Sequence, residues 1–293
     1  MPLRLKTALA NSDEDIDRNI EYSFTQPYIP FTELLKSQSG AVSVVGSGPS
    51  LKRNWKKLRD SGHDIVACNA ACQFLLERDI VPKYMFCFDA DPLTYEFFTP
   101  HPDITYLLAS RVATKAWEIL KGCKIVCWHS AGDKNVLDLV EKSGRMEPMI
   151  TGGTAAVTRA MHVVQNMGYS EIHQWGADAS FAGGETHIRQ STTVEKRMLV
   201  HMNRRTFETA PWMAQQIEDF KILVPLLTQF CGITVVVHGD GYLPHLARAM
   251  TKPGCAEYTS IPRGKLRVED GEPWLRQFVR ELKWNISYLM QTI

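Results

Sequence analysis

The sequence has no uninterrupted apolar run of the length that a membrane-spanning helix needs. Its opening stretch, MPLRLKTALANSDEDIDRNIEY, turns acidic and polar where a signal peptide would require an apolar segment. Charge of one sign is not in excess either, because the formal net charge is +1, which gives no general electrostatic basis for binding nucleic acid or a membrane surface. We therefore expect a cytoplasmic protein with no membrane-spanning segment and without nucleic acid as a partner.

Metal-binding cysteine sets and internal repeats are also missing. Three residues separate Cys68 from Cys72 and Cys123 from Cys127, but neither pair is flanked by zinc-type partners. Most of the seven cysteines lie inside strand-like runs, where a buried thiol is the common outcome. Hydrophobic residues make up 44% and charged residues 22% of the 293 residues, which is typical of a globular protein with a sizeable core.

What the sequence does contain is an alternation of short β-branched runs and longer amphipathic segments from Ala41 onward. This alternation predicts an α/β fold with a doubly wound, mostly parallel, Rossmann-like sheet and helices on both of its faces. The predicted strands are 41–45, 64–68, 84–88, 104–108, 124–128, 171–175 and 233–237. The predicted helices are 50–60, 70–78, 112–121, 134–142, 153–167, 207–230, 243–250 and 273–290. The helix 207–230 is expected to be shortened or bent near Pro211 or Pro225.

The composition divides the chain into three parts. Residues 1–38 have no clean period and contain Pro27 and Pro30, so we expect an irregular arm over the main domain. Residues 39–250 should form the α/β domain, and 251–293 should form a helical C-terminal extension that begins with a loop. Whether the chain forms a homo-oligomer is left open by the sequence.

The strongest local signal is the strand AVSVV followed by the turn Gly46-Ser47-Gly48-Pro49-Ser50. Glycines allow close backbone approach, and a helix beginning near Ser50 would present free N–H groups and the positive end of its dipole to a phosphate. The turn therefore predicts nucleotide binding. Because it lacks the third glycine of the dinucleotide fingerprint and the GK[ST] of a P-loop, a plain tight turn with Ser50 as N-cap is the alternative.

Two further predicted strands end in polar residues, at Asn69 and at Asp89-Ala90-Asp91. The carboxyl ends of parallel strands share one edge of an open sheet, so Ser47, Asn69 and Asp89 should meet in one crevice. Alternate residues of a strand point to the same side, so Asp89 and Asp91 together would hold Mg²⁺ against the phosphates of a nucleotide. The alternative is that Asp91, which precedes Pro92, caps the next segment.

The second half of the chain adds four candidate site residues. Gly153 and Thr154 open a predicted helix whose N-terminus would receive a phosphate or a sugar hydroxyl. Asp178 follows the predicted strand EIHQW, and the small-residue loop after it carries His187. His187 is a candidate general acid or base because the ordinary pKa of histidine lies near neutrality, although a lone loop histidine is more often a solvated surface residue. The later segment HGDGY predicts either a glycine turn or a ligand contact.

Together, the ordered motifs GSGPSL, ACNAACQFLLERDIVPKYMFCFDADP, GGTAAVTRAMHVVQNMGYSEIHQWGADASF and GETH resemble the MptE-like 6-hydroxymethylpterin diphosphokinase family over residues 40 to 240. The resemblance implies an ATP- and Mg²⁺-dependent enzyme that transfers diphosphate to the hydroxymethyl group of a reduced pterin. It further implies phosphate binding by Gly46, Gly48, Pro49 and Ser50, metal binding by Asp89 and Asp91, and a site lined by Asp178.

The chain departs from this pattern at Asn69-Ala70, where the diphosphokinases look to carry an Asp-Gly pair. Asn69 is instead similar to the nucleotide-contacting asparagine of the bacterial sialyltransferases, which resemble this chain more distantly. Glycosyl transfer from a nucleotide sugar is therefore the alternative. Sialyltransferases are thought not to need the metal that the two aspartates favour, but other sugar-nucleotide enzymes use an Asp-x-Asp pair.

The sequence thus predicts a transferase, either a diphosphotransferase or a glycosyltransferase, that binds a small-molecule nucleotide and an acceptor. A catalytically silent nucleotide-binding protein is the third interpretation. The candidate catalytic residues are Asp89, Asp178 and His187. The metal would offset charge on the leaving group, and His187 would move a proton at the acceptor hydroxyl.

Overall fold

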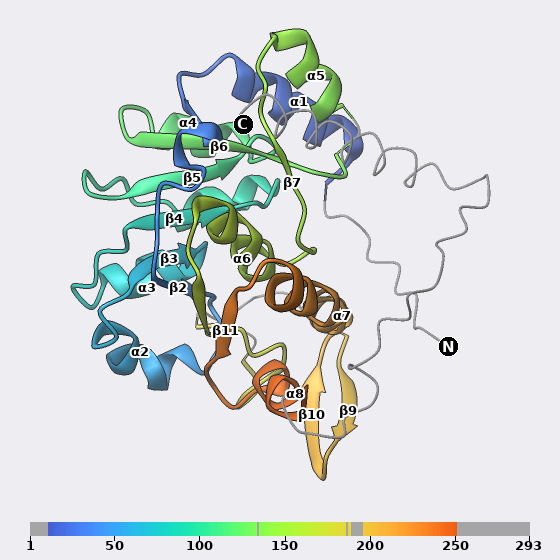
Figure 1. Cartoon of the computed structure of the whole chain (residues 1–293). Coiled ribbons are helices and arrows are strands. Elements are labelled where there is room, and N and C mark those ends of the chain that lie inside the picture. Colours follow the sequence, from blue (N-terminus) through green and yellow to red (C-terminus); the bar gives the residue numbers. More distant parts are fainter. Residues whose placement is uncertain (1–10, 134, 186, 189–195, 251–293) are drawn as a thin grey trace.

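The computed structural model describes residues 11–133, 135–185, 187–188 and 196–250. Their centre is a nine-stranded parallel sheet in the order β1-β6-β5-β4-β3-β2-β8-β11, with β7 paired to β6 beside this path (Figure 1). These strands are β1 Ile29–Pro30, β2 Ala41–Val45, β3 Asp64–Cys68, β4 Tyr84–Cys87, β5 Thr105–Ala109, β6 Lys124–Ser130, β7 Met149–Ile150, β8 Glu171–Trp175 and β11 Thr234–Val237. A separate antiparallel hairpin consists of β9 Met198–Met202 and β10 Arg205–Thr209.

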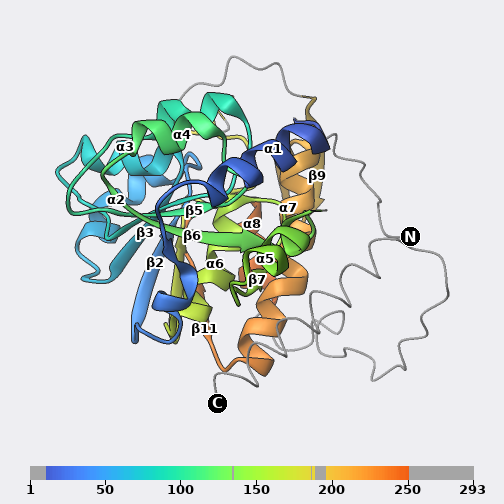
Figure 2. The same ribbon diagram turned by 90° about the horizontal axis from the view of Figure 1, so that it is seen from above.

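Helices cover both faces of the sheet because the order in which the chain adds strands reverses at β2. From β2 the chain adds β3, β4, β5 and β6 toward one edge, and it then returns to place β8 and β11 on the other side of β2. Right-handed crossovers therefore put the connecting helices of the two halves on opposite faces (Figure 2). The predicted doubly wound α/β fold is confirmed.

The helices in sequence order include three short non-α turns. They are α1 Asp13–Phe24, η1 Phe31–Leu34, α2 Leu51–Arg59, α3 Ala70–Leu76, η2 Pro92–Phe97, α4 Thr114–Ile119, α5 Val136–Ser143, α6 Ala156–Met167, α7 Pro211–Pro225, η3 Leu226–Phe230 and α8 Tyr242–Met250. The central helix α6 packs across β2, β3, β4 and β8, whereas α2 and α3 contact β8 and β3. Because both faces are covered, the central strands are continuous apolar runs, and all five residues of β5 are buried.

The N-terminal segment is not the irregular arm that the sequence predicted. Ser12 caps α1 by accepting a hydrogen bond from the Asp15 N–H at 3.1 Å, and acidic residues in the first turn complement the helix dipole. Ile16 and Ile20, four residues apart, are buried against α5 and β7. The two prolines that suggested irregular structure follow the helix, and the segment then adds β1 to the edge strand β6.

The helix predicted over 207–230 is shorter in the structure, and its ends lie at the two prolines near which shortening or bending was predicted. Its first residues belong to β10, and α7 begins only at Pro211, whose fixed φ and missing N–H suit the first turn of a helix. At the other end, Pro225 closes the α-helix and the chain continues as the π-helical turn η3. The hairpin β9–β10 and the short strands β1 and β7 were not predicted, because two-residue strands carry no period and the hairpin lacks a glycine-rich turn.

The predicted C-terminal extension, 251–293 with its helix 273–290, lies outside the described residues. Within them, no helix combines the length and the apolar character that crossing a membrane requires. Cys68, Cys87 and Cys127 are buried as their strand-like surroundings predicted, whereas Cys231, predicted in the same way, is exposed. Burial raises the pKa of these three thiols and of the buried Cys72.

A histidine cluster lies where β11 pairs with β8. The ring of His238 stacks on Trp175, with 3.5 Å between the centroids and 2° between the planes, and its Nε2 lies 2.9 Å from His173 Nδ1. Burial, together with the charges of the nearby His173, His63 and Lys57, lowers the pKa of His238 to about 4. The folded protein therefore holds His238 neutral over a range in which the unfolded chain binds a proton.

This depressed pKa predicts a loss of stability in mild acid. The contribution of neutral His238 to the free energy of unfolding is fully present above pH 6.5, the ordinary pKa of histidine. It is lost as pH falls toward 4, because the unfolded state binds the proton first. We expect His238→Gln to reduce this acid-dependent loss of unfolding free energy by roughly 2 kcal/mol, after discounting for solvent screening. Urea denaturation between pH 7.5 and 4 measures it. The control His201→Gln, at an exposed hairpin position, should leave the pH profile unchanged, and an unaltered profile for His238→Gln would contradict the assignment.

Candidate functional site

The turns after β2 and β8 come into direct backbone contact at the point where the strand order reverses. The Gly46 N–H donates to Trp175 O at 2.8 Å, and the Gly48 N–H donates to Gly176 O at 2.7 Å. A Cβ atom on Gly46 would lie 2.7 Å from Gly176 O, which is closer than real contacts allow. The glycines of the turn are therefore needed because two backbones meet, and this switch point is where open α/β sheets bind ligands.

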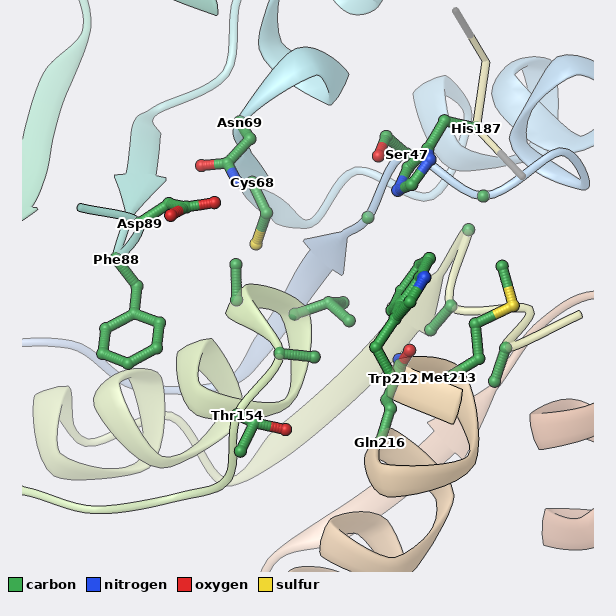
Figure 3. Close-up of a pocket in the computed structure, with 18 of the residues that line it drawn as sticks. Ser47, Cys68, Asn69, Phe88, Asp89, Thr154, His187, Trp212, Met213 and Gln216 are labelled. Carbon is green, nitrogen blue, oxygen red and sulfur yellow. The ribbon is translucent and has the colours of Figure 1, made fainter. Parts of the chain in front are cut away.

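A cavity of about 320 Å³ opens at this point along the carboxyl ends of β2, β3, β4 and β8 (Figure 3). Residues from the strand ends, from the start of α6 and from α7 line it: Asn11, 46–48, Cys68, Asn69, 88–90, Arg111, 154–157, 176–179, His187, Trp212, Met213 and Gln216. The structure thus brings Ser47, Asn69 and Asp89 into one cavity, as their positions after parallel strands predicted.

Four of the five residues in the turn 46–50 do not offer an N–H group to a phosphate. Gly46 and Gly48 donate to β8 and its turn, Pro49 has no N–H, and the Ser50 N–H donates to Asp178 Oδ2 at 2.8 Å. Pro49 and Ser50 are buried outside the cavity lining, and the Ser50 side chain makes no capping hydrogen bond to α2. The alternative of a tight turn describes this backbone, and only 46–48 line the cavity.

Asp178 ties three loops together from a buried position. Its side chain is 5% exposed, Oδ2 accepts from Ser50, and Oδ1 has no hydrogen-bond partner among the described groups. A Cβ on Gly241 would lie 2.6 Å from the Asp178 Cβ, so the HGDGY segment packs its glycines against this residue. Burial raises the pKa of the Asp178 carboxyl, and the Ser50 N–H opposes that rise. Asp178 therefore lines the cavity as predicted, and it also stabilises the contacts between the turns that surround the cavity.

Asn69 has the backbone strain typical of a functional position. Its φ of 49° and ψ of −125° lie in a region that side-chain-bearing residues rarely adopt, and its side chain does not cap α3. The Asn69 N–H donates to Phe86 O at 3.1 Å, whereas the buried Oδ1 has no partner among the described groups. The cavity thus contains an oriented amide oxygen that a ligand would satisfy.

The two aspartates after β4 have different positions and different hydrogen-bonding roles. Asp89 lines the cavity, and its Oδ1 accepts from the Asp91 N–H at 3.1 Å. Withdrawal from bulk water raises the pKa of the Asp89 carboxyl, with a further contribution from the charge of Asp91. Asp91 itself lies outside the cavity lining and caps η2, because its Oδ1 accepts from the Leu93 N–H at 2.8 Å. The structure therefore supports the capping interpretation of Asp91, and the paired arrangement expected for Mg²⁺ is not formed.

The loop before α6 also differs from the predicted phosphate site. The helix begins at Ala156, and both the N–H and the hydroxyl of Thr154 donate to Asp219 Oδ2 of α7 at 2.7 Å. Gly153 lies against the same carboxylate, 2.8 Å from a constructed Cβ to the Asp219 Cβ, and it does not line the cavity. Asp219 thus occupies the place at which the sequence predicted a ligand phosphate, and it joins α7 to α6.

Arg111 and Trp212, which were not predicted as site residues, supply the cavity's positive charge and its aromatic wall. Arg111 is the one cationic residue among the described residues that line it, and its Nη1 lies 2.7 Å from Asp133 Oδ1. Trp212 stacks with His187, with 5.5 Å between the ring centroids and 9° between their planes, so the structure places His187 at the cavity rather than on the open surface. Arg111 follows β5, and the rule that located Asn69 and Asp89 could have found it.

The comparisons with known proteins agree with this architecture. The family model described as 6-hydroxymethylpterin diphosphokinase MptE-like matches residues 16–184. The chain belongs to the MptE-like family. Among solved structures, it is similar to the MAf glycosyltransferase from Magnetospirillum magneticum AMB-1, with a TM-score of 0.55 and 14% sequence identity over 96% of this chain. The chain spans 43% of that glycosyltransferase, and no curated protein matches it. The family supports a transferase-type function, and the structural neighbour shows a similar fold.

The contact between the β2 and β8 turns predicts that replacing a glycine with alanine here destabilises the protein, which is the opposite of the usual effect. Alanine at a glycine of ordinary φ normally stabilises a protein by about 0.4 to 1 kcal/mol, because it restricts the unfolded chain. At Gly48 a Cβ would overlap Asp178 and lie 2.6 Å from Gly176 O, so Gly48→Ala should instead cost about 1 to 3 kcal/mol in urea denaturation. The control Ser47→Ala, in the same turn, should change stability by less than about 0.5 kcal/mol. A stabilising Gly48→Ala would show that the turns are not in contact.

Proposed function

We propose that the chain transfers a glycosyl group from a nucleotide sugar whose phosphate end lies between Ser47, Asn69 and Arg111. The observation that carries this proposal is the charge of the cavity. The described lining residues include two carboxylates, Asp89 and Asp178, and one guanidinium that is already paired. The N–H groups of Gly46, Gly48, Ser50 and Thr154, which were expected to bind phosphates, donate within the protein, and a third carboxylate, Asp219, adjoins Thr154.

These groups favour a donor with one or two phosphates over a triphosphate. Each additional phosphate adds negative charge, and charge taken out of water needs cationic partners or hydrogen-bond donors to compensate it. Arg111 is the one Lys or Arg side chain among the described lining residues. The structural neighbour that is a glycosyltransferase supports this donor class by its fold, while the family description supports diphosphoryl transfer from ATP to a hydroxymethyl acceptor, which is the second candidate.

Asp89 is suited to accept the acceptor's proton. Its raised pKa brings the carboxyl closer to the working range of a general base. In the proposed step the acceptor oxygen forms a bond to the anomeric carbon, the bond from that carbon to the phosphate oxygen breaks, and the nucleotide leaves with the electron pair. The hydroxyl proton passes to Asp89, and Arg111 compensates the charge on the departing phosphate. His187, stacked on Trp212, holds the donor rather than moving the proton.

A divalent cation would fit at Asp89 only with help from the donor. No group of three or more His, Cys, Asp or Glu side chains in the described part of the chain would hold a metal. Asp91 uses an oxygen to cap η2, so the protein ligands for Mg²⁺ would be Asp89 and the amide oxygen of Asn69, completed by phosphate oxygens. When bound there, the ion would neutralise charge on the leaving phosphate.

The acceptor is expected to enter through a second cavity that adjoins the first. This cavity of about 280 Å³ shares Phe88, Arg111 and Thr154 with the donor site. Its other wall comes from α1, through Asp13 and Asp17, which are hydrogen-bond acceptors suited to hydroxyl groups. The N-terminal helix would then be part of the acceptor site.

Donor binding separates the candidate functions. We expect CMP- or UDP-sugars to bind at least tenfold more tightly than ATP in calorimetry with and without Mg²⁺, because the site compensates little phosphate charge. Slow donor hydrolysis, followed as nucleotide release, gives an activity readout without knowledge of the acceptor. Tighter, metal-dependent ATP binding with AMP release would overturn the proposal in favour of diphosphoryl transfer, and donor binding without any turnover would favour a binding protein.

The neighbouring aspartates provide a matched pair of variants. Asp89→Asn should lower the rate of donor turnover about 100-fold or more, since a positioned general base contributes about that much, while the donor Kd stays within about threefold. Asp91→Asn keeps a capping oxygen on η2 and should behave as the parent protein. Equal rates for both variants would remove Asp89 from the mechanism, and a loss of only the Mg²⁺-dependent part of binding would make it a metal ligand.

A further inference from the structure

The face of α7 that borders the cavity has two features that the proposed transfer step does not use. Trp212 and Gln216 are four residues apart and so lie on the same face of the helix, and Met213 lies beside them. Figure 3 shows the Trp212 ring beside the cavity, with His187 above it and Gln216 below. These side chains are remote in sequence from the strand-end turns that hold Ser47 and Asn69.

Gln216 is a buried amide with an unsatisfied donor. The residue is 4% exposed, it lines the cavity, and its Nε2 has no hydrogen-bond partner among the described groups. A buried donor without a partner destabilises the empty protein, and a ligand that accepts the hydrogen bond removes that cost. The amide therefore points to a ligand with an acceptor atom at this depth of the cavity.

The wall beside Gln216 is flat and aromatic. The rings of His187 and Trp212 are within 9° of parallel, and aromatic side chains of this kind stack on planar ligands with little preference among them. An aromatic face next to a single oriented amide is the arrangement that binds a nucleobase, because the ring carries the stacking and the amide distinguishes the atoms at the base edge. A sugar ring or a phosphate would use neither the plane nor the amide as fully.

The supporting helix is fixed in place, so the two groups are held ready for a ligand. Asp219, one turn beyond Gln216, accepts from the Thr154 N–H and hydroxyl at 2.7 Å and from Gln215 Nε2 at 3.0 Å. These bonds join α7 to the loop before α6, which also lines the cavity. The spacing between the aromatic wall and the phosphate end of the site is therefore set by a rigid contact.

We propose that α7 carries the nucleobase subsite of this enzyme, with Trp212 stacking the base and Gln216 selecting it through a hydrogen bond to its edge. The inference rests on the proposed function only in requiring that the cavity binds a nucleotide. It assigns base selectivity to a helix outside the strand-end turns, whereas Asn69, Asp89 and Arg111 act at the other end of the donor.

The test uses CMP, UMP, AMP, GMP and the base-free probe ribose 5-phosphate, titrated into the full chain by calorimetry. Trp212→Ala should weaken all four nucleotides about 10- to 100-fold and leave ribose 5-phosphate within twofold. Gln216→Leu, which keeps the side-chain volume and removes the amide, should weaken the preferred nucleotide at least tenfold and level the ranking among bases. The matched control Gln229→Leu, at an exposed position of η3 outside the cavity lining, should preserve the ranking.

The outcomes separate this inference from the function on which it rests. If the parent protein binds none of the four nucleotides, the proposed function fails. If it binds them but Gln216→Leu leaves the ranking unchanged, or Trp212→Ala weakens ribose 5-phosphate as much as the nucleotides, only the assignment of α7 is overturned. Trp212→Phe, which retains a stacking face, should recover most of the affinity lost in Trp212→Ala and so excludes misfolding as the cause.

Discussion

The backbone contact between the turns that follow β2 and β8 determines where the cavity lies and what faces it. Gly46 and Gly48 approach Gly176 so closely that their N–H groups become part of the frame. Asp178 completes the contact by accepting from Ser50, with Gly241 packed against its side chain. Because this frame uses its own polar groups, ligand recognition is left to the side chains that border it.

Much of this arrangement could be predicted from the order of strands along the chain. Parallel strands that end in Ser47, Asn69 and Asp89 must place those residues along one edge, so their convergence follows from period and topology alone. The direction of the N–H groups could not be predicted, because it depends on partners such as Gly176 and Asp178 that are far away in the sequence. A turn's residue types show that close approach is needed, but they do not show what approaches.

Because local sequence does not show which distant group approaches a turn, it also led to the prediction of a phosphate at Thr154. The sequence placed a phosphate at a helix N-terminus, and the structure places a carboxylate there, 65 residues away along the chain. Both are anions that accept from the same N–H and hydroxyl groups, so local sequence cannot distinguish them. The early start of the predicted helix 207–230 had a related effect, because it concealed that Trp212 and Gln216 lie in the first turns of a helix that begins at the cavity.

These constraints reconcile a family named for diphosphoryl transfer with a cavity that offers little compensation for three phosphates. The sheet itself supplies a crevice whose glycines serve backbone packing, and this crevice carries no information about the number of phosphates in the donor. Under the proposed function, donor choice depends instead on the groups around the crevice: an amide at Asn69, one paired guanidinium at Arg111 and the aromatic face of α7. A related chain with more cations at those positions would use the same sheet and the same switch point for a different donor.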